Sequence, residues 1–484
     1  MAISRRQFLK RGGLVGAGTL LGPGLFGNGL LRQAYAALEA NDRYFVVIFL
    51  DGGNDGLNTV IPVDDVAGLR TAYDAARNNI NITPGELTNS LIGLDPISGT
   101  QLGIHPAFNV PNDHFENGAG AGGLKALYDL GKVAVIQGCG YPEYSLSHEE
   151  ARVIWQTGVP LGPSAGTGWI GRHLAAQYAG NQIPAVNIND SIVGEFRQTG
   201  TSVLAVRDLD RFTFPFDDNY QGDIAAKSAA FSALAQAAIS GAQPAALFLG
   251  NTGLATIDAT AAYQELSSNY NDDRPVFRQL YGDIGRSMSN DLREVARVIW
   301  GVENGVPNVN ARFFQLGNGG YDTHSDQGGA EPNGQHYDLH AELGAALKVF
   351  YDDLASMPGN VANRTTILVW SEFSRRIPQN QNGTDHGSQG PMFVIGGSVN
   401  GGVYGNHPNI EDSALDYEGN TEYTQSANSF RSTDFRDVYG TILKHWVSLP
   451  QGTVQGLLPL DDTAEALADP DHYWRSADFD LGFL

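Results

Sequence analysis

The chain has 484 residues, a formal net charge of −23 and a single cysteine, Cys139. The acidic balance argues against nucleic acid or an anionic membrane surface as a partner. One cysteine excludes an internal disulfide and a thiolate cluster, so any metal site must use Asp, Glu and His, a ligand set that favours Zn, Mn, Mg or Ca.

The N-terminal segment has the three-part order of an export signal. Residues 4–10, SRRQFLK, match the twin-arginine pattern, a Gly-broken apolar stretch follows at 12–26, and Ala34-Tyr35-Ala36 offers small residues for cleavage. The apolar stretch is shorter than the ~20 residues of a stable span. The alternative is an amphipathic or disordered N-terminal tail, but we expect a cleaved signal over residues 1–36 and no later membrane span.

The predicted signal has a consequence for charge and for location. Its removal takes away five basic residues and no acidic one, which lowers the formal charge from −23 to −28. We therefore predict a periplasmic or secreted protein that the Tat translocase exports already folded. A metal can then be bound before export.

Six short apolar runs are rich in β-branched and aromatic residues and predict strands buried on both faces. They lie at 43–50, 132–137, 183–188, 311–316, 365–370 and 392–395. Helices are predicted between them at 124–130, 148–156, 171–178 and 335–357. Strands that alternate with helices indicate an α/β fold with a mostly parallel central sheet.

We expect a single α/β domain over residues 41–450. Two polar stretches, 80–103 and 398–429, are interpreted as inserted loops, and residues 451–484 as an irregular C-terminal tail. His336 and His340 lie one helical turn apart beside the apolar stripe of the last predicted helix, so we interpret them as structural or supporting residues.

Polar side chains recur where the predicted strands end. The carboxyl ends of parallel strands meet at one edge of a sheet, so we expect these side chains to gather there. Carboxylate and imidazole groups hold hard or borderline metals, and a hydroxyl can serve as a nucleophile. The candidates are Asp51, Ser145, Ser147, His148, Asp322, His324, Glu372, Asp385 and His386.

Each candidate also has a purely structural explanation. Asp51 with Asp55 can stabilise a Gly-rich turn, and Ser147-His148 can open a helix as its N-cap. The segments 322–324 and 385–386 can be surface turns. The recurrence of these groups at strand ends is the reason to expect a site.

Several longer segments carry a family resemblance. They are FLDGGNDGLNT at 49–59, SH at 147–148, WQTG at 155–158, GWIGR at 168–172, YDTH at 321–324, SEFSR at 371–375, GTDHG at 383–387 and TDFR at 433–436. In these segments, and over nearly all of the mature chain, the protein resembles the exported family called domain of unknown function 1501. That family is similar to a distant branch of the alkaline phosphatase/sulfatase superfamily. The resemblance implies a three-layer alkaline-phosphatase-like fold.

The resemblance also implies a first metal site. In that superfamily two metals lie at the carboxyl edge of the sheet, beside a Ser, Thr or modified Cys nucleophile. Asp322, His324 and His386 resemble the ligands of the first metal, although the superfamily usually has the middle histidine further along the chain.

The second metal of the superfamily is less well matched. Asp51 resembles its first-strand ligand, and Glu372 resembles the carboxylate of its carboxylate–histidine pair. Phe373 stands where that histidine is expected, so we expect one or two divalent ions.

The nucleophile implied by the resemblance is a serine near the helix that begins at His148. Ser147 is the preferred candidate, because it lies just before a helix N-terminus that would favour an anion. Ser145 is the second, because relatives have the nucleophile a few residues before the matching histidine, nearer Tyr144 or Ser145. His148 is a candidate proton shuttle or ligand. Cys139 does not lie in a Cys-x-Pro-x-Arg motif, so we do not expect a formylglycine sulfatase.

These observations predict a metal-dependent hydrolase of phosphate or sulfate esters, acting on a small-molecule or glycan ester. Arg172 and Arg375 are candidate clamps for the anion. The alternative is a non-catalytic periplasmic or cell-surface protein that keeps a metal or glycan site. Phe373 and the uncertain nucleophile favour that alternative.

Overall fold

Residues 44–484 form one compact unit of the chain. The predicted export signal, residues 1–36, lies outside the described residues. The computed structural model describes residues 42–109, 122–160, 166–178, 183–198, 202–212, 224–241, 243–332, 334–410, 431–459, 461, 474 and 479–484.

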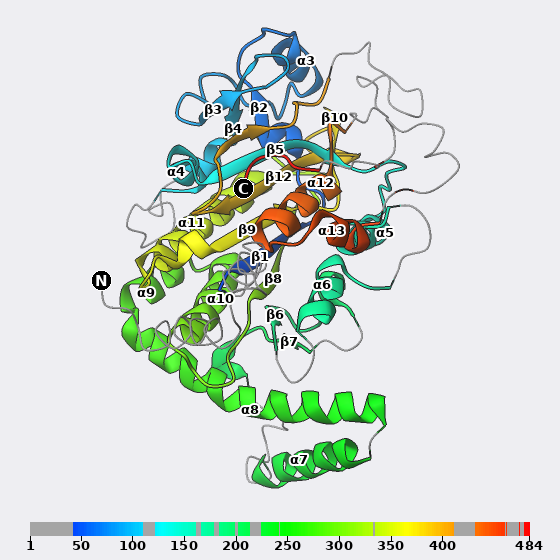
Figure 1. The fold of residues 1–484 in the computed structure, drawn as a ribbon. Helices are drawn as coiled ribbons and strands as arrows, with labels where there is room; N and C mark the ends of the chain where they lie inside the picture. The colour runs from blue at the N-terminus through cyan, green and yellow to red at the C-terminus, as the bar shows by residue number, and fades with distance from the viewer. Residues whose placement is uncertain are drawn as a thin grey trace, which may run out of the picture. The chain divides into compact units, whose positions relative to one another are not determined.

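A nine-stranded sheet forms the centre of this unit (Figure 1). Its strands are β1 (Tyr44–Asp51), β5 (Val133–Gly140), β6 (Ala185–Asn187), β7 (Val203–Ala205), β8 (Phe313–Gly319), β9 (Thr365–Trp370), β12 (Gly390–Gly396), β13 (Gly402–Tyr404) and β14 (Thr433–Asp434). The strand order is β13-β5-β12-β9-β1-β8-β6-β7, and β14 also pairs with β5. Every pair is parallel except the two that β12 forms. The predicted α/β fold with a mostly parallel sheet is confirmed.

Alternate residues of β1 pack on opposite faces of the sheet, as the strand period of two requires. Tyr44, Val46, Ile48 and Leu50 enter one hydrophobic core, and Phe45, Val47 and Phe49 enter another. The sheet is therefore the middle of three layers.

Two sets of helices form the outer layers. The first core includes residues of α4 (Leu124–Asp129), α8 (Pro244–Asp273), α9 (Pro275–Ile284), α10 (Ser287–Glu303) and α11 (Gln335–Ser356). The second includes residues of α5 (His148–Thr157), α6 (Trp169–Gln177), α12 (Phe435–Thr441) and α13 (Gln451–Leu457).

Smaller elements surround these layers. A three-stranded sheet contains β2 (Val60–Pro62), β4 (Gln101–Ile104) and β3 (Leu91–Leu94), and a hairpin contains β10 (Ser374–Gln379) and β11 (Thr384–Gly387). Two further helices are α3 (Leu69–Ala76) and α7 (Ile224–Ser240), and α7 packs against α8 (Figure 1). Short 3-10 or π turns are η1 (Gly56–Asn58), η2 (Pro106–Asn109), η4 (Gly194–Phe196), η5 (Leu209–Arg211), η7 (Val361–Arg364) and η8 (Ile442–Trp446).

The segments expected as loops and tail contain regular structure. The range 80–103 holds β3 and most of β4, and 398–429 holds β13, while residues 411–430 lie outside the described residues. The expected irregular tail begins with α13, and Trp474, Phe479 and Phe483 are buried in the second core. The tail differs from the expectation because burial of these large aromatic side chains stabilises an ordered chain. No helix among the described residues is long and apolar enough to cross a bilayer.

The imidazole of His173, on α6, makes stability depend on pH. Its side chain is only 4 % exposed and lies against Tyr178 and Phe313, and burial lowers its pKa from 6.5 to about 4. Between about pH 6.5 and pH 4 the imidazole of His173 is therefore mostly protonated in the unfolded chain and mostly neutral in the folded chain. The contribution of His173 is fully present above that pH and is lost as the pH falls to about 4, a loss of about 3 kcal/mol.

We expect His173→Gln to remove this part of the acid sensitivity. Urea unfolding of both proteins at about pH 7 and about pH 4 measures it. The drop in unfolding free energy between the two pH values should be about 3 kcal/mol smaller in the variant. An equal drop in both proteins would contradict the prediction.

Candidate metal centre

The topology brings segments that are far apart in the sequence to one edge of the sheet. The strands β1, β5, β8 and β9 run in one direction, so their carboxyl ends share an edge. The antiparallel strand β12 begins at that same edge. Asp322, Glu372 and the start of α5 follow three of the parallel strands, and His386 lies just before β12.

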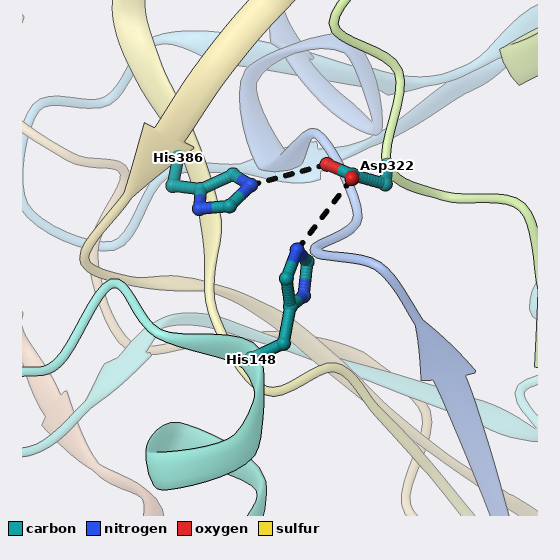
Figure 2. A group of neighbouring side chains, drawn as sticks. All are labelled: His148, Asp322 and His386. Atoms are coloured by element: carbon teal, nitrogen blue, oxygen red, sulfur yellow. Dashed lines mark hydrogen bonds and ion pairs between the residues drawn. The ribbon is translucent and has the colours of Figure 1, made fainter.

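His148, Asp322 and His386 form a compact group at this edge (Figure 2). Within the part of the chain that the structure describes, their ligand atoms all lie within 4.8 Å of one another. The Nε2 atom of His386 is 3.1 Å from Oδ1 of Asp322, and Nε2 of His148 is 3.5 Å from Oδ2. Both imidazole rings point toward the carboxylate (Figure 2).

A third imidazole borders this group. Nε2 of His324 is 3.1 Å from Oδ1 of Asp322 and 3.0 Å from Nε2 of His386. We call His148, Asp322, His324 and His386 the histidine cluster. Three of its members match predicted metal ligands, and His148 was predicted as a shuttle or ligand.

The other nitrogen of each histidine faces an outer hydrogen-bond acceptor. Nδ1 of His148 is 2.8 Å from the Glu372 carboxylate, and Nδ1 of His324 is 3.1 Å from that of Asp385. Nδ1 of His386 is 2.9 Å from a backbone oxygen, that of Leu146. Carbonyl and carboxylate oxygens only accept, and a neutral ring has one N–H, so a proton placed on Nδ1 satisfies the outer oxygen and leaves Nε2 facing Asp322 without a hydrogen.

This assignment turns three Nε2 lone pairs toward one carboxylate. Burial lowers the pKa of His386 and outweighs the opposing effects of Leu146 and Asp322, which favours its neutral form. Lone pairs that face a carboxylate repel it unless a cation lies between them. Neutral imidazoles whose second nitrogen is anchored to an oxygen are the usual ligands of a protein-bound metal. The residues present therefore fit a divalent metal such as Zn or Mn.

Asp322 is ionised at neutral pH. Partial burial raises the pKa of its carboxyl, but the hydrogen bond and positive charge of Arg375 oppose burial, and together with the nearby histidines they bring the pKa to about 2. The Arg375 guanidinium is itself buried, and its Nη2 lies 2.7 Å from Oδ1 of Asp322. The cluster thus keeps the negative charge of Asp322 over the whole physiological range.

Glu372 lies behind His148 and outside the compact group. Its fully buried carboxylate accepts the backbone N–H groups of Gly52 at 3.0 Å and of Gly53 at 3.2 Å, besides facing Nδ1 of His148. Both glycines have positive φ, +124° and +85°, and a Cβ on Gly53 would lie 2.4 Å from the Phe373 ring. The sequence Asp51-Gly52-Gly53 thus forms a tight turn. The Glu372 carboxylate can therefore bind both the backbone of this turn and the imidazole of His148.

We expect Glu372→Gln to weaken metal binding by about 10- to 100-fold, the usual effect of losing an outer partner of a ligand histidine. The amide keeps the shape but no longer fixes the tautomer and basicity of His148. Competition with a chromophoric chelator measures the affinity. Glu149→Gln, an exposed change on α5, is the matched control, and equal affinities in both variants would count against the role given to Glu372.

Asp51 forms an ion pair that the sequence did not predict. Its Oδ1 accepts from Nη2 of Arg152 at 2.6 Å, and the two side chains are 43 % and 36 % exposed. The Arg152 guanidinium also lies 5.1 Å from the centre of the Phe49 ring. Arg152 follows His148 by one turn of α5, and this i,i+4 spacing was the signal that would have identified it.

The two serines differ in their surroundings. Ser147 is the N-cap residue of α5, but its side chain makes no capping hydrogen bond, is exposed, and bonds no described residue. Ser145 donates its hydroxyl to Glu150 at 2.8 Å. Ser147, which adjoins His148, therefore keeps the freer hydroxyl of the two.

The two arginines expected to clamp an anion have other partners. Arg172 donates to the backbone oxygens of Thr157, Thr167 and Leu457. Arg375 donates to those of Gly52, Gly53, Tyr321 and Thr384, besides Asp322. Arg172 thus satisfies carbonyl groups that include the C-terminal residues of α5 and α13, and Arg375 satisfies those of the turns around Asp322. These contacts correct the expectation.

The remaining residues singled out by sequence are packed near the cluster. The Phe373 ring centre is 4.8 Å from that of His148 and 4.4 Å from that of His386, so an apolar ring borders the cluster on this side. His336 and His340 are fully buried, with Nε2 atoms 3.0 Å from Asn54 Oδ1 and Thr59 Oγ1. Their predicted structural role agrees with these contacts.

A family model described as "Protein of unknown function (DUF1501)" matches residues 128–423. The matched range is well over half of the 484 residues and contains all four members of the histidine cluster. No curated protein matches the chain.

Proposed function

We propose a function for this chain, which belongs to the DUF1501 family of proteins of unknown function. It is a metal-dependent hydrolase of phosphate or sulfate esters, and the histidine cluster is its metal centre. One observation carries the proposal: three histidines present Nε2 to the Asp322 carboxylate while each Nδ1 is anchored on an oxygen. A metal, when bound there, would polarise the ester and lower the pKa of water.

We also infer a distant relation to the alkaline phosphatase/sulfatase-like superfamily. Support comes from the three-layer arrangement and from the cluster at the carboxyl edge of a mostly parallel sheet. Asp51 at the end of β1 is a further match. Phe373, in the position of a second-metal histidine, favours a centre with one ion.

The neighbouring residues supply the other parts of ester hydrolysis. Arg152 lies one helical turn from His148 and is partly exposed, so its guanidinium can bind the anionic oxygens of the ester. The free hydroxyl of Ser147 can attack the phosphorus or sulfur atom, with water as the alternative nucleophile. Glu372 keeps His148 in one orientation throughout.

A hydrolysis assay tests the proposal. The mature protein, loaded with Zn or Mn, is offered p-nitrophenyl phosphate, bis(p-nitrophenyl) phosphate and p-nitrophenyl sulfate. We expect metal-dependent release of p-nitrophenol from at least one of them. Ser147→Ala should lower the rate by at least about 100-fold if that hydroxyl attacks, while Ser268→Ala, an exposed change on α8, leaves it unchanged.

Two outcomes of this assay change the proposal. An unchanged rate in Ser147→Ala assigns the attack to water. Bound metal without hydrolysis of any ester favours the second candidate, a non-catalytic protein that keeps a metal or glycan site. The specific observation behind that candidate is that no described residue engages the Ser147 hydroxyl.

We further propose export through the twin-arginine route to the periplasm or the medium, because residues 4–10 match that signal. A metal bound in the cytoplasm would then travel inside the folded chain. Replacing Arg5 and Arg6 by lysine should retain the protein in the cytoplasm, as fractionation and immunoblotting would show. Unchanged export of that variant would refute the route.

A further inference from the structure

A cavity of about 770 Å³ lies at the ends of β6 and β7. Asn189 and Asp190 follow β6, Arg207 and Asp208 follow β7, and α10 forms another wall. The strands β6 and β7 are parallel to β1 and β8, so this cavity and the histidine cluster share the carboxyl edge of the sheet. Three strand spacings separate β7 from β1, about 15 Å.

The charges that line this cavity nearly cancel. Arg207 lies 3.4 Å from Asp190, and Arg211 lies 3.6 Å from Asp208. A third arginine, Arg293 on α10, lies 3.3 Å from Glu294. Three arginines thus line the cavity together with four carboxyl groups. Because the lining has almost no net charge, it does not favour the binding of a polyanion or a polycation.

The fourth carboxylate belongs to Asp291, which differs from the others. It is partly buried and forms no hydrogen bond or close ion pair with a residue that the structure describes. Burial raises its pKa to about 7, although the charge of Arg207 opposes this. A carboxyl withdrawn from water without a donor is costly, and a ligand that supplies an O–H would offset that cost.

We propose that this cavity binds a neutral, hydroxyl-rich carbohydrate. Guanidinium groups only donate hydrogen bonds, carboxylates only accept them, and the amides of Asn189 and Asn290 do both. A sugar hydroxyl can donate one hydrogen bond and accept others. Each hydroxyl can therefore accept from an arginine and donate to an aspartate of the cavity. Phe212 adds an apolar surface for the C–H face of a sugar ring, and the volume lies in the range of small-ligand sites.

This inference goes beyond the proposed hydrolysis, because the cavity can hold a sugar whether or not the metal centre turns over. A glycan bound at β6 and β7 would lie on the same sheet edge as the cluster. If a neutral part of a longer glycan binds in the cavity and another sugar of that glycan carries a phosphate or sulfate ester, the cavity binds the neutral part and the cluster acts on the ester.

A glycan array tests the inference on the mature protein. The array carries neutral oligosaccharides, sulfated and uronic acid oligosaccharides, and amino-sugar oligosaccharides. We expect binding to neutral members, and the tightest of these is then titrated by calorimetry. Asp291→Ala should weaken its binding by at least about tenfold, the usual effect of losing a hydrogen bond to a charged group.

Two further variants keep the test decisive. Arg207→Gln changes a side chain that is 67 % exposed, so the protein folds, and it should also weaken binding by about tenfold. Asp272→Asn, an exposed change on α8 outside the cavity, should bind as the wild type does. Absence of any neutral glycan from the bound set, or equal affinity in wild type and Arg207→Gln, would overturn the inference. Metal content, measured on the same samples, separates this failure from failure of the metal centre.

Discussion

Replacing Asp322 with alanine is expected to remove the bound metal and every activity that depends on it. Asp322 is the only carboxylate in the histidine cluster, and the Nε2 atoms of all three histidines lie within 3.5 Å of its oxygens. Outer partners of ligand histidines already contribute about 10- to 100-fold to affinity. Loss of the negative ligand itself should therefore weaken binding by at least about 100-fold.

Elemental analysis of the purified mature protein measures this effect. The wild type should hold roughly one ion per chain after metal loading and dialysis, and Asp322→Ala almost none. Asp338→Ala, an exposed change on α11, is the control for a lost surface carboxylate. His386→Ala is a second test that leaves the Asp322–Arg375 pair intact. Equal and negligible metal in all four proteins would refute the metal centre.

The second large effect is expected from Arg77→Met, which should lower the unfolding free energy by about 3–5 kcal/mol. Arg77 and Asp55 form an ion pair in which neither side chain is exposed. Burial raises the pKa of Asp55, but Arg77 outweighs it and the pKa is lowered, so the carboxyl stays charged. Methionine would leave that charge buried without its partner.

The same arginine also connects three segments of the chain. Its Nε donates to the oxygen of Ile377 at 2.9 Å and its Nη1 to Oδ1 of Asn58 at 3.1 Å. Thermal or urea unfolding measures the loss, and Arg211→Met, at an ion pair whose arginine is 89 % exposed, should cost less than about 1 kcal/mol. The double variant Arg77→Met with Asp55→Leu should regain part of the stability, because a buried pair can be replaced by apolar groups. A single variant as stable as wild type would show that the pair contributes nothing.

The local pattern of the sequence predicted the sheet well, and its failures have identifiable reasons. All six predicted strands belong to the one sheet. β12 runs antiparallel because the segment between β9 and β12 folds as the β10–β11 hairpin rather than as a crossover, so β12 begins at the sheet edge where β9 ends. β7, β13 and β14 have only two or three residues, too few for a periodic signal.

The helical region before β8 was not predicted. α7 and α8 are rich in alanine and lack a clear apolar stripe, so their sequences show no helical period in hydrophobicity. α10 does carry a stripe, at Met288, Leu292, Val295 and Ile299, and that spacing was sufficient to predict a helix.

The sequence by itself determined which chemical groups stand at the strand ends, because strand periodicity and the polar residues that follow a strand lie within short windows. His148, Asp322, His324 and His386 were identified in this way. Only the tertiary structure decided how they are used: which nitrogen of each ring points inward, that Glu372 supports His148, and that Arg152 lies beside Asp51. His148 and Glu372 are 224 positions apart, and such a distance is set by packing of the whole sheet, which no local pattern encodes.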